Sequence, residues 1–180
     1  MLTLNKKNKI IFFISFFFYI IPSISYSNET LPFNNIVQHT IPKKVFPVVF
    51  ENFNGEKVSL GDYKGKLVIL NFWATWCQPC KEEMSSLDNL YKNDNFKNLE
   101  ILAVNMEKPN LEKTQKFFDD VNITNLSIYF DNNLNFVKYF KLRGVPTTVF
   151  INKKGKEFAK AIGLIDFTNK KLLQWLLIYD

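Results

Sequence analysis

An apolar run over residues 66–73 (KLVILNFW) is separated by only three residues from the pair Cys77 and Cys80, which enclose Gln-Pro. Apolar residues then recur at helical spacing, which predicts a helix over 77–92. Pro79 is compatible with this helix because a proline is tolerated in the first turn. The pattern therefore predicts a buried strand, a short loop and two thiols at the start of a helix.

The two cysteines are the only ones in 180 residues, and they are predicted to form a redox disulfide, Cys77–Cys80, rather than a structural crosslink. A bridge across so short a loop stabilises a fold by about 2 kcal/mol, against about 4.7 kcal/mol for a 100-residue loop. A bridge that stabilises little but is easily reduced is typical of a catalytic pair. Because a helix N-terminus favours a thiolate, Cys77 is predicted to be the more exposed nucleophile and Cys80 the resolving thiol.

The same C-x-x-C pattern also forms half of a zinc site, but a structural zinc site takes four ligands. The chain offers two cysteines and a single histidine, His39, far from them in the sequence. We therefore expect no metal site and no cofactor. His39 is predicted to be a solvated residue of a linker.

The N-terminal segment is predicted to direct export. Three lysines precede an apolar run over 10–21, and small residues follow at 22–27. The run is shorter than the roughly 20 residues of a membrane-spanning helix, which favours a signal peptide over 1–27 cleaved near Ser27. The alternative is an uncleaved tether through residues 10–24. Either way the remainder is predicted to lie in the periplasm, as a linker over 28–44 and one domain over 45–180.

The formal charge of +6 does not indicate a nucleic-acid partner. Removing residues 1–27 takes away three lysines and no acid, which leaves 20 basic against 17 acidic residues, or +3. The lysines are also scattered along the chain rather than clustered. We therefore expect no nucleic-acid binding.

Strand and helix signals alternate over residues 45–180. A hairpin is expected around Asn54-Gly55, a dipeptide favoured in tight turns, and a strand-turn-strand unit with a terminal amphipathic helix ends the chain. These signals predict an α/β fold with a mixed central sheet and helices on both faces. The expected strands are 48–52, 57–59, 66–73, 100–105, 126–130, 147–152 and 156–162, and the expected helices are 77–92, 110–122, 134–140 and 167–178.

A second motif, Gly144-Val145-Pro146-Thr147, leads directly into a predicted strand. A proline at the first position of a strand costs no ladder hydrogen bond. In a redox fold of this kind, a cis Pro146 would face the thiols and leave backbone groups free to pair with an extended client peptide.

Residues 71–84 (NFWATWCQPCKEEM), followed by Gly144-Val145-Pro146-Thr147-Thr148, resemble the thioredoxin fold. More narrowly they are similar to the exported TlpA/ResA/DsbE group, with an inserted helix-strand unit between 105 and 130 that looks closest to the TlpA branch. The resemblance implies a periplasmic reductase, often membrane-tethered, with Cys77 as attacking thiol, Cys80 as resolving thiol and Pro146 as cis proline. It also implies client proteins that carry disulfides, either apocytochrome c or copper-site assembly proteins of cytochrome oxidase. Electrons would come from a membrane thiol reductase of the DsbD/CcdA type.

One position departs from the cytosolic thioredoxin pattern, because Asn71 stands where those proteins place a buried aspartate. A neutral amide cannot take the proton from Cys80. Some ResA-type proteins use a glutamate that comes after the strand following the active-site helix. That strand is predicted here over 100–105, so Glu107 is a candidate for proton transfer. Client contact is assigned to the residues around the two motifs, namely Trp76, Gln78, Pro79 and Val145. Trp73, in contrast, is expected in the core.

Three other functions are considered. A DsbA-like oxidant is disfavoured because no large helical insertion is present and the dipeptide is not Pro-His; a potential near −120 mV instead of −270 mV would indicate it. A copper carrier of the Sco type needs a wider cysteine spacing and a distal histidine, and His39 lies in the predicted linker. A peroxidase needs Thr-x-x-Cys, which Thr75-Trp76-Cys77 does not provide.

Overall fold

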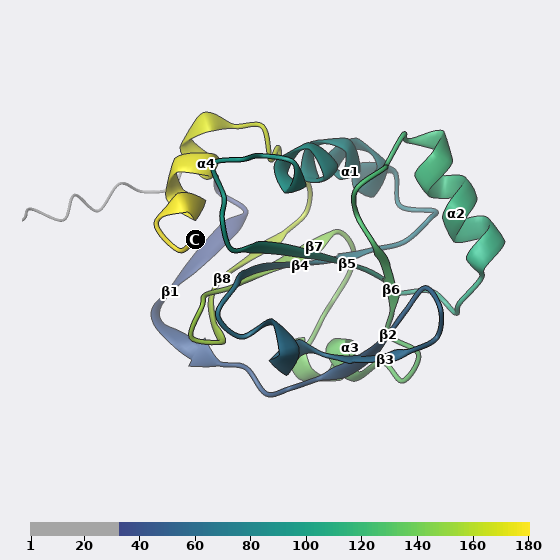
Figure 1. The fold of residues 1–180 in the computed structure, drawn as a ribbon, viewed down its shortest axis with the longest axis horizontal. Helices are drawn as coiled ribbons and strands as arrows, with labels where there is room; N and C mark the ends of the chain where they lie inside the picture. The colour runs from purple at the N-terminus through teal and green to yellow at the C-terminus, as the bar shows by residue number, and fades with distance from the viewer. Residues whose placement is uncertain (1–32) are drawn as a thin grey trace, which may run out of the picture. The chain divides into compact units, whose positions relative to one another are not determined.

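A computed structural model describes residues 33–180, which are built around an eight-stranded mixed sheet (Figure 1). The expected signal segment over 1–27 lies outside the described residues. Across the sheet the strand order is β1-β8-β7-β4-β5-β6-β2-β3. The strands are β1 (Ile36–Lys44), β2 (Val49–Asn52), β3 (Lys57–Ser59), β4 (Leu67–Trp73), β5 (Leu99–Asn105), β6 (Ile128–Phe130), β7 (Thr147–Ile151) and β8 (Lys156–Ile162).

The central strands combine parallel and antiparallel pairing. β4, β5 and β6 are parallel neighbours, whereas β7 runs antiparallel to both β4 and β8. β4 is fully buried, in keeping with its unbroken apolar sequence. The register pairs Phe72 of β4 with Thr147 of β7. The C-terminal end of β4, which leads to the cysteine loop, therefore lies beside the N-terminal end of β7, which follows Pro146.

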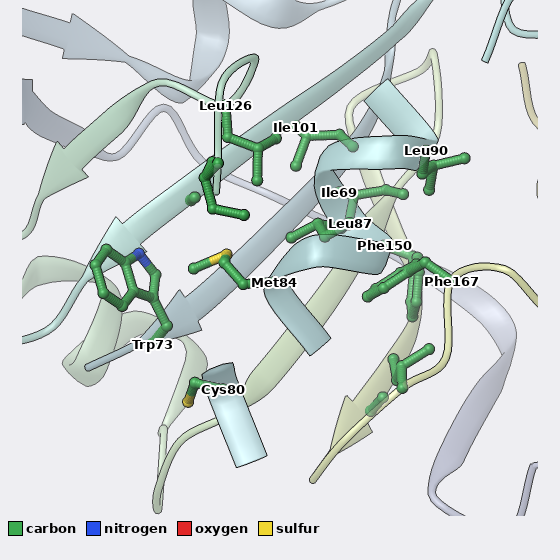
Figure 2. Packing of buried hydrophobic residues seen from close by; sticks show 14 of the residues in the cluster. Ile69, Trp73, Cys80, Met84, Leu87, Leu90, Ile101, Leu126, Phe150 and Phe167 are labelled. Carbon is green, nitrogen blue, oxygen red and sulfur yellow. The ribbon is translucent and has the colours of Figure 1, made fainter. Parts of the chain in front are cut away.

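Helices cover both faces of this sheet, as the sequence predicts (Figure 1). The helices are α1 (Gln78–Tyr91), α2 (Leu111–Asp120), α3 (Asn135–Phe140) and α4 (Lys170–Leu177), with a short 3-10 helix, η1, at Leu60–Tyr63. One apolar cluster takes Met84 from α1, Phe117 from α2 and Leu172 from α4. The cluster on the other face contains Phe136 of α3. Figure 2 shows the first cluster, with Met84 and Leu87 of α1 packed among residues of the strands.

The hairpin and the inserted unit have the expected form. β2 and β3 pair around the Asn54-Gly55 turn, where Gly55 has a φ of 79° that suits glycine. α2 and β6 form the helix-strand unit between β5 and α3, and β6 joins the sheet beside β5.

The prediction of a linker over 28–44 is wrong for the second half of that range, because residues 36–44 form the strand β1. This strand lies at the edge of the sheet, antiparallel to β8, and only Ile36 is buried along it. An edge strand with one buried residue carries no apolar alternation, which explains why the sequence suggested a linker. Pro42 is accommodated because the register shifts between Gln38 and Lys43, and prolines occur at edge strands and bulges.

His39 is also placed differently from the prediction. It belongs to β1, and its Nε2 lies 2.8 Å from Oε1 of the buried Glu157 on β8. The side chain therefore fastens the edge strand to the sheet instead of facing solvent. Within residues 33–180, no group of three His, Cys, Asp or Glu side chains is arranged to hold a metal ion.

Candidate active site

The two cysteines are joined in a disulfide at the N-terminus of α1. Cys77 is the residue that caps the helix, and its Sγ accepts a hydrogen bond of 3.2 Å from the backbone N–H of Cys80. Cys80 lies on the same face of α1 as Met84 and Leu87, which point into the core (Figure 2). The positive end of the helix therefore lies at Cys77, where it favours a thiolate.

The expected difference in exposure between the two cysteines is not found in this oxidised form. Cys77 is 3% exposed and Cys80 is 1% exposed, because both residues belong to the apolar cluster that contains Met84 and Leu87 of α1. The helix-capping position, rather than exposure, is what distinguishes Cys77. Its role as nucleophile and that of Cys80 as resolving thiol stay predictions.

The Val145–Pro146 peptide bond is cis, and Pro146 directly precedes β7, at the end of that strand that lies beside the end of β4 leading to the cysteine loop. The carbonyl of Pro146 accepts a hydrogen bond of 2.9 Å from Gly163 N–H, which follows β8. Val145 is half-buried and packs against both apolar clusters. The flanking residues Ile162 and Leu164 are exposed apolar side chains that the sequence analysis did not assign to the site.

The side chains assigned to client contact surround this buried disulfide. Trp76 is 71% exposed, and Gln78 and Pro79 are exposed as well. Trp73, in contrast, is fully buried, as expected. Tryptophan is enriched at protein interfaces, so the exposed Trp76 is suited to contact with a client. The role of these residues in client binding stays a prediction.

A buried carboxyl group, Glu83, lies one turn along α1 from Cys80. The residue is 1% exposed, and residues three apart on a helix have Cβ atoms about 5–6 Å apart. Its Oε1 accepts a hydrogen bond of 2.6 Å from Asn71 Nδ2, and its Oε2 accepts one of 2.8 Å from Ile165 N–H. Burial raises the pKa of Glu83 to about 7, although both hydrogen bonds oppose the rise. The group can therefore gain or lose a proton at neutral pH.

Asn71 is a hydrogen-bond donor to Glu83, a contact that the sequence analysis did not predict. Its Nδ2 donates to Glu83 and also, at 3.0 Å, to Thr148 Oγ1 on β7. Its Oδ1 is buried without a hydrogen-bond partner among the described residues. The amide of Asn71 thus holds the carboxyl group of Glu83 in place against β7.

The position of Glu83 could have been noticed in the sequence. It lies between Cys80 and Leu87 on the face that the helical pattern assigns to the core, and an acid there is unusual. The pattern could not show its partners, because Asn71 and Ile165 lie 12 and 82 residues away along the chain.

Glu107, the residue proposed for proton transfer, holds the loop before Cys77. Its Oε2 accepts a hydrogen bond of 2.6 Å from Thr75 N–H, and its Oε1 lies 2.7 Å from Lys113 Nζ. Burial raises the pKa of Glu107, but the hydrogen bonds from Lys113 and Thr75 outweigh burial and hold the pKa below its usual value. An ionised carboxylate engaged at both oxygens is suited to anchoring the loop.

A family model described as AhpC/TSA matches residues 37–156 of this chain. The chain belongs to the AhpC/TSA family. The match extends from β1 through the cysteine pair and Pro146 to the start of β8. It therefore includes both motifs of the active site.

The AhpC/TSA chain is similar to several proteins named thiol-disulfide oxidoreductase ResA. The one from Halalkalibacterium halodurans is 38% identical over 108 residues, which are 60% of this chain and 60% of that protein. The one from Geobacillus kaustophilus is 29% identical over 153 residues, or 85% of this chain and 87% of that protein. The more similar relative is thus matched over less than two thirds of its length.

A solved structure is similar to this protein in fold. StoA from Bacillus subtilis has a TM-score of 0.60 and 26% identity, with 72% of this chain and 98% of StoA covered. Together with the ResA relatives it confirms the thioredoxin-like fold and the resemblance to the TlpA/ResA/DsbE group. The relatives compared by sequence are named ResA, and none of these comparisons singles out the TlpA branch.

The two assignments for Glu107 in this family member make different predictions for Glu107→Gln. If the carboxylate anchors the loop, the variant loses about 1.5–3 kcal/mol of unfolding free energy at pH 7, the range for hydrogen bonds to charged groups. Because the pKa is lowered, this difference is present above the unfolded-state pKa and shrinks as the pH falls through the folded-state value. Urea unfolding at pH 7 and pH 3 measures it. A proton-transfer role would instead slow thiol exchange and leave stability unchanged.

Proposed function

We propose that this protein is a thiol–disulfide oxidoreductase that reduces disulfides in specific partner proteins outside the cytosol. The observation that carries the proposal is the Cys77–Cys80 disulfide at the start of α1, with Pro146 at the start of the neighbouring strand β7 and a buried titratable carboxyl group, Glu83, one helical turn from Cys80. The AhpC/TSA match and the names of the ResA relatives support it.

In the first step, Cys77 of the reduced protein attacks a disulfide of the client as a thiolate. The unpaired N–H groups at the start of α1 stabilise the negative charge on its sulfur. A mixed disulfide forms between Cys77 and one client cysteine, and the other client cysteine leaves as a thiolate. The backbone around Pro146 pairs with the extended client segment during this step.

In the second step, Cys80 resolves the mixed disulfide. Its thiol transfers a proton to the carboxylate of Glu83, whose pKa of about 7 suits it to accept one at neutral pH. The Cys80 thiolate then attacks the sulfur of Cys77, the Cys77–Cys80 disulfide forms, and the client leaves with both of its cysteines reduced. The two electrons given to the client therefore come from the two thiols of the protein.

Reduction of the resulting disulfide requires an outside donor of two electrons. A membrane thiol reductase of the DsbD/CcdA type is proposed for this step, and apocytochrome c or copper-site assembly proteins of cytochrome oxidase are the proposed clients. The periplasm is the proposed location, with either cleavage near Ser27 or a tether through residues 10–24. Among the residues that the structure describes, no helix is both long and apolar enough to cross a bilayer. A neighbour in fold, Etrx1 of Streptococcus pneumoniae, is an exposed lipoprotein, which supports a location outside the cytosol.

The Cys80→Ser variant tests this function by trapping the client. Without Cys80 the mixed disulfide at Cys77 cannot resolve, so clients should accumulate as covalent adducts that are identified after non-reducing separation. The expected result is a narrow set, either apocytochromes or copper-site assembly proteins. The matched control is the double variant with Cys77→Ser as well, which should capture nothing. A broad set of unrelated exported proteins would indicate a general oxidant and contradict the proposal.

A further inference from the structure

A hollow lies beside the chain segments that flank the redox pair in the sequence. It is lined by Thr75 and Trp76, which precede Cys77, by Lys81, which follows Cys80, and by one side of α2. The α2 side consists of Lys113, Lys116, Phe117 and Asp120. Its volume is about 210 Å³, which is below the roughly 300–1,000 Å³ of small-molecule sites and suits a single side chain of a bound polypeptide.

The charge of this hollow is positive. Its lining contains three lysines and one aspartate, a formal charge of +2. Two of the lysines are already compensated, because Lys116 pairs with Asp120 and Lys113 with Glu107, each at 2.7 Å. Lys81 makes no ion pair with any described residue, and its Nζ lies 6.0 Å from the ring centre of Phe117.

A second polar group of the hollow also has no partner. Thr75 is 91% buried, and its hydroxyl group makes no hydrogen bond with any described residue. A hydroxyl can donate a hydrogen bond to a carboxylate, as an ammonium group can. The hollow thus combines an uncompensated cation with a spare hydroxyl donor, and the exposed Trp76 forms part of its lining.

We infer that this hollow receives an acidic side chain, aspartate or glutamate, that neighbours the reactive cysteine of the client. The carboxylate pairs with Lys81 and approaches the Thr75 hydroxyl, while the flanking client backbone lies against Trp76. The inference rests on the proposed function, because the client must be attacked by Cys77 for its neighbouring residue to reach the hollow. It assigns Lys81 a role in client choice and none in the exchange chemistry.

The test uses the reduced full-length protein, purified in mild detergent, and fluorogenic peptides that each carry one disulfide. The peptides differ only at the residues flanking the reactive cysteine, which are glutamate, glutamine or lysine. We expect the second-order rate constant to be about ten-fold higher for glutamate than for glutamine, and lower again for lysine. The glutamate advantage should shrink as the salt concentration is raised to about 1 M, because the Debye length there is only about 3 Å.

The decisive variant is Lys81→Glu, which should reverse the order of the glutamate and lysine peptides when the rate of each is divided by the rate of the glutamine peptide with the same variant. The matched control is Lys154→Glu, the same change of charge in the exposed turn at the opposite end of β7 from Pro146, which should keep the original order. Equal rates for the three peptides, or an unchanged order in Lys81→Glu, would overturn the inference. If no peptide is reduced at all, the proposed function itself fails, so the two failures are distinguishable.

Discussion

Replacing Glu83 by glutamine is expected to slow resolution of the mixed disulfide at pH 7 by about 100-fold, at the lower end of the 10²–10⁴ range for general acid–base catalysis. Glutamine has the same shape but cannot accept the proton of Cys80. Its amide oxygen can still accept from Asn71 or from Ile165 N–H, so the helix position stays filled. The fall in rate therefore reports the lost proton acceptor and not a disrupted fold.

The pH profile distinguishes this role from a structural one. In the unmodified protein, resolution should accelerate as Glu83 ionises and level off above its pKa of about 7. In the glutamine variant the rate should keep rising toward the ordinary thiol pKa of about 8.5. The measurement is the single-turnover release of a fluorescent peptide preloaded on Cys77. The matched control is Glu82→Gln, which changes the exposed neighbour of Glu83 on α1 and should leave the pH profile unchanged. An unchanged profile in Glu83→Gln would mean that Glu83 serves only in packing and not in proton transfer.

Stability gives an independent test of the same group. Because the folded-state pKa is raised from 4.5 to about 7, the native form holds a proton over this interval that the unfolded chain has released. Unfolding free energy therefore falls as the pH rises from 4.5 to 7, by about 3 kcal/mol for a shift of this size. We expect urea unfolding of the oxidised protein to show this fall in unfolding free energy. In the Glu83→Gln variant, the contribution of Glu83 to the fall should be absent.

Most of the fold could be predicted because its elements carry strong local signals. The apolar run of β4 and the helical spacing of α1 identify a buried strand and an amphipathic helix without any tertiary information. The turn at Asn54-Gly55 defines the hairpin in the same way. β1 lacked such a signal, because its stability comes from the backbone ladder with β8 and from the contact of His39 with Glu157.

The active site was only partly predictable, because motifs identify sulfur chemistry but not the groups that serve it. Cys77 and Cys80 were identified by their spacing. Glu83 was missed because its burial and its raised pKa depend on Asn71 and Ile165, which only the folded chain brings together. Glu107 was selected by resemblance, yet its carboxylate contacts Thr75 and Lys113, and this arrangement favours loop anchoring.

Replacing Trp73 by alanine is expected to lower the unfolding free energy by about 3–5 kcal/mol, the usual loss for a buried tryptophan. Trp73 ends β4 and is fully buried. Its ring centre lies 4.5 Å from that of Phe117 and 5.4 Å from that of Phe118, both on α2. Deleting the indole therefore removes the contact that fixes α2 to the sheet behind the cysteine loop. Urea unfolding of the oxidised variant measures the loss.

Trp73→Phe is the matched comparison, and its expected cost is much smaller, under about 2 kcal/mol. The indole Nε1 is buried and has no hydrogen-bond partner among the described residues, so the native protein already bears the desolvation cost of that N–H group. Phenylalanine keeps an aromatic surface toward Phe117. It also removes the unpaired N–H donor, and this gain offsets part of the free-energy cost of the cavity left by the smaller ring. A loss equal to that of alanine would mean that the N–H group has a partner in solution, such as a buried water. The packing against α2 would then be the lesser contribution of Trp73.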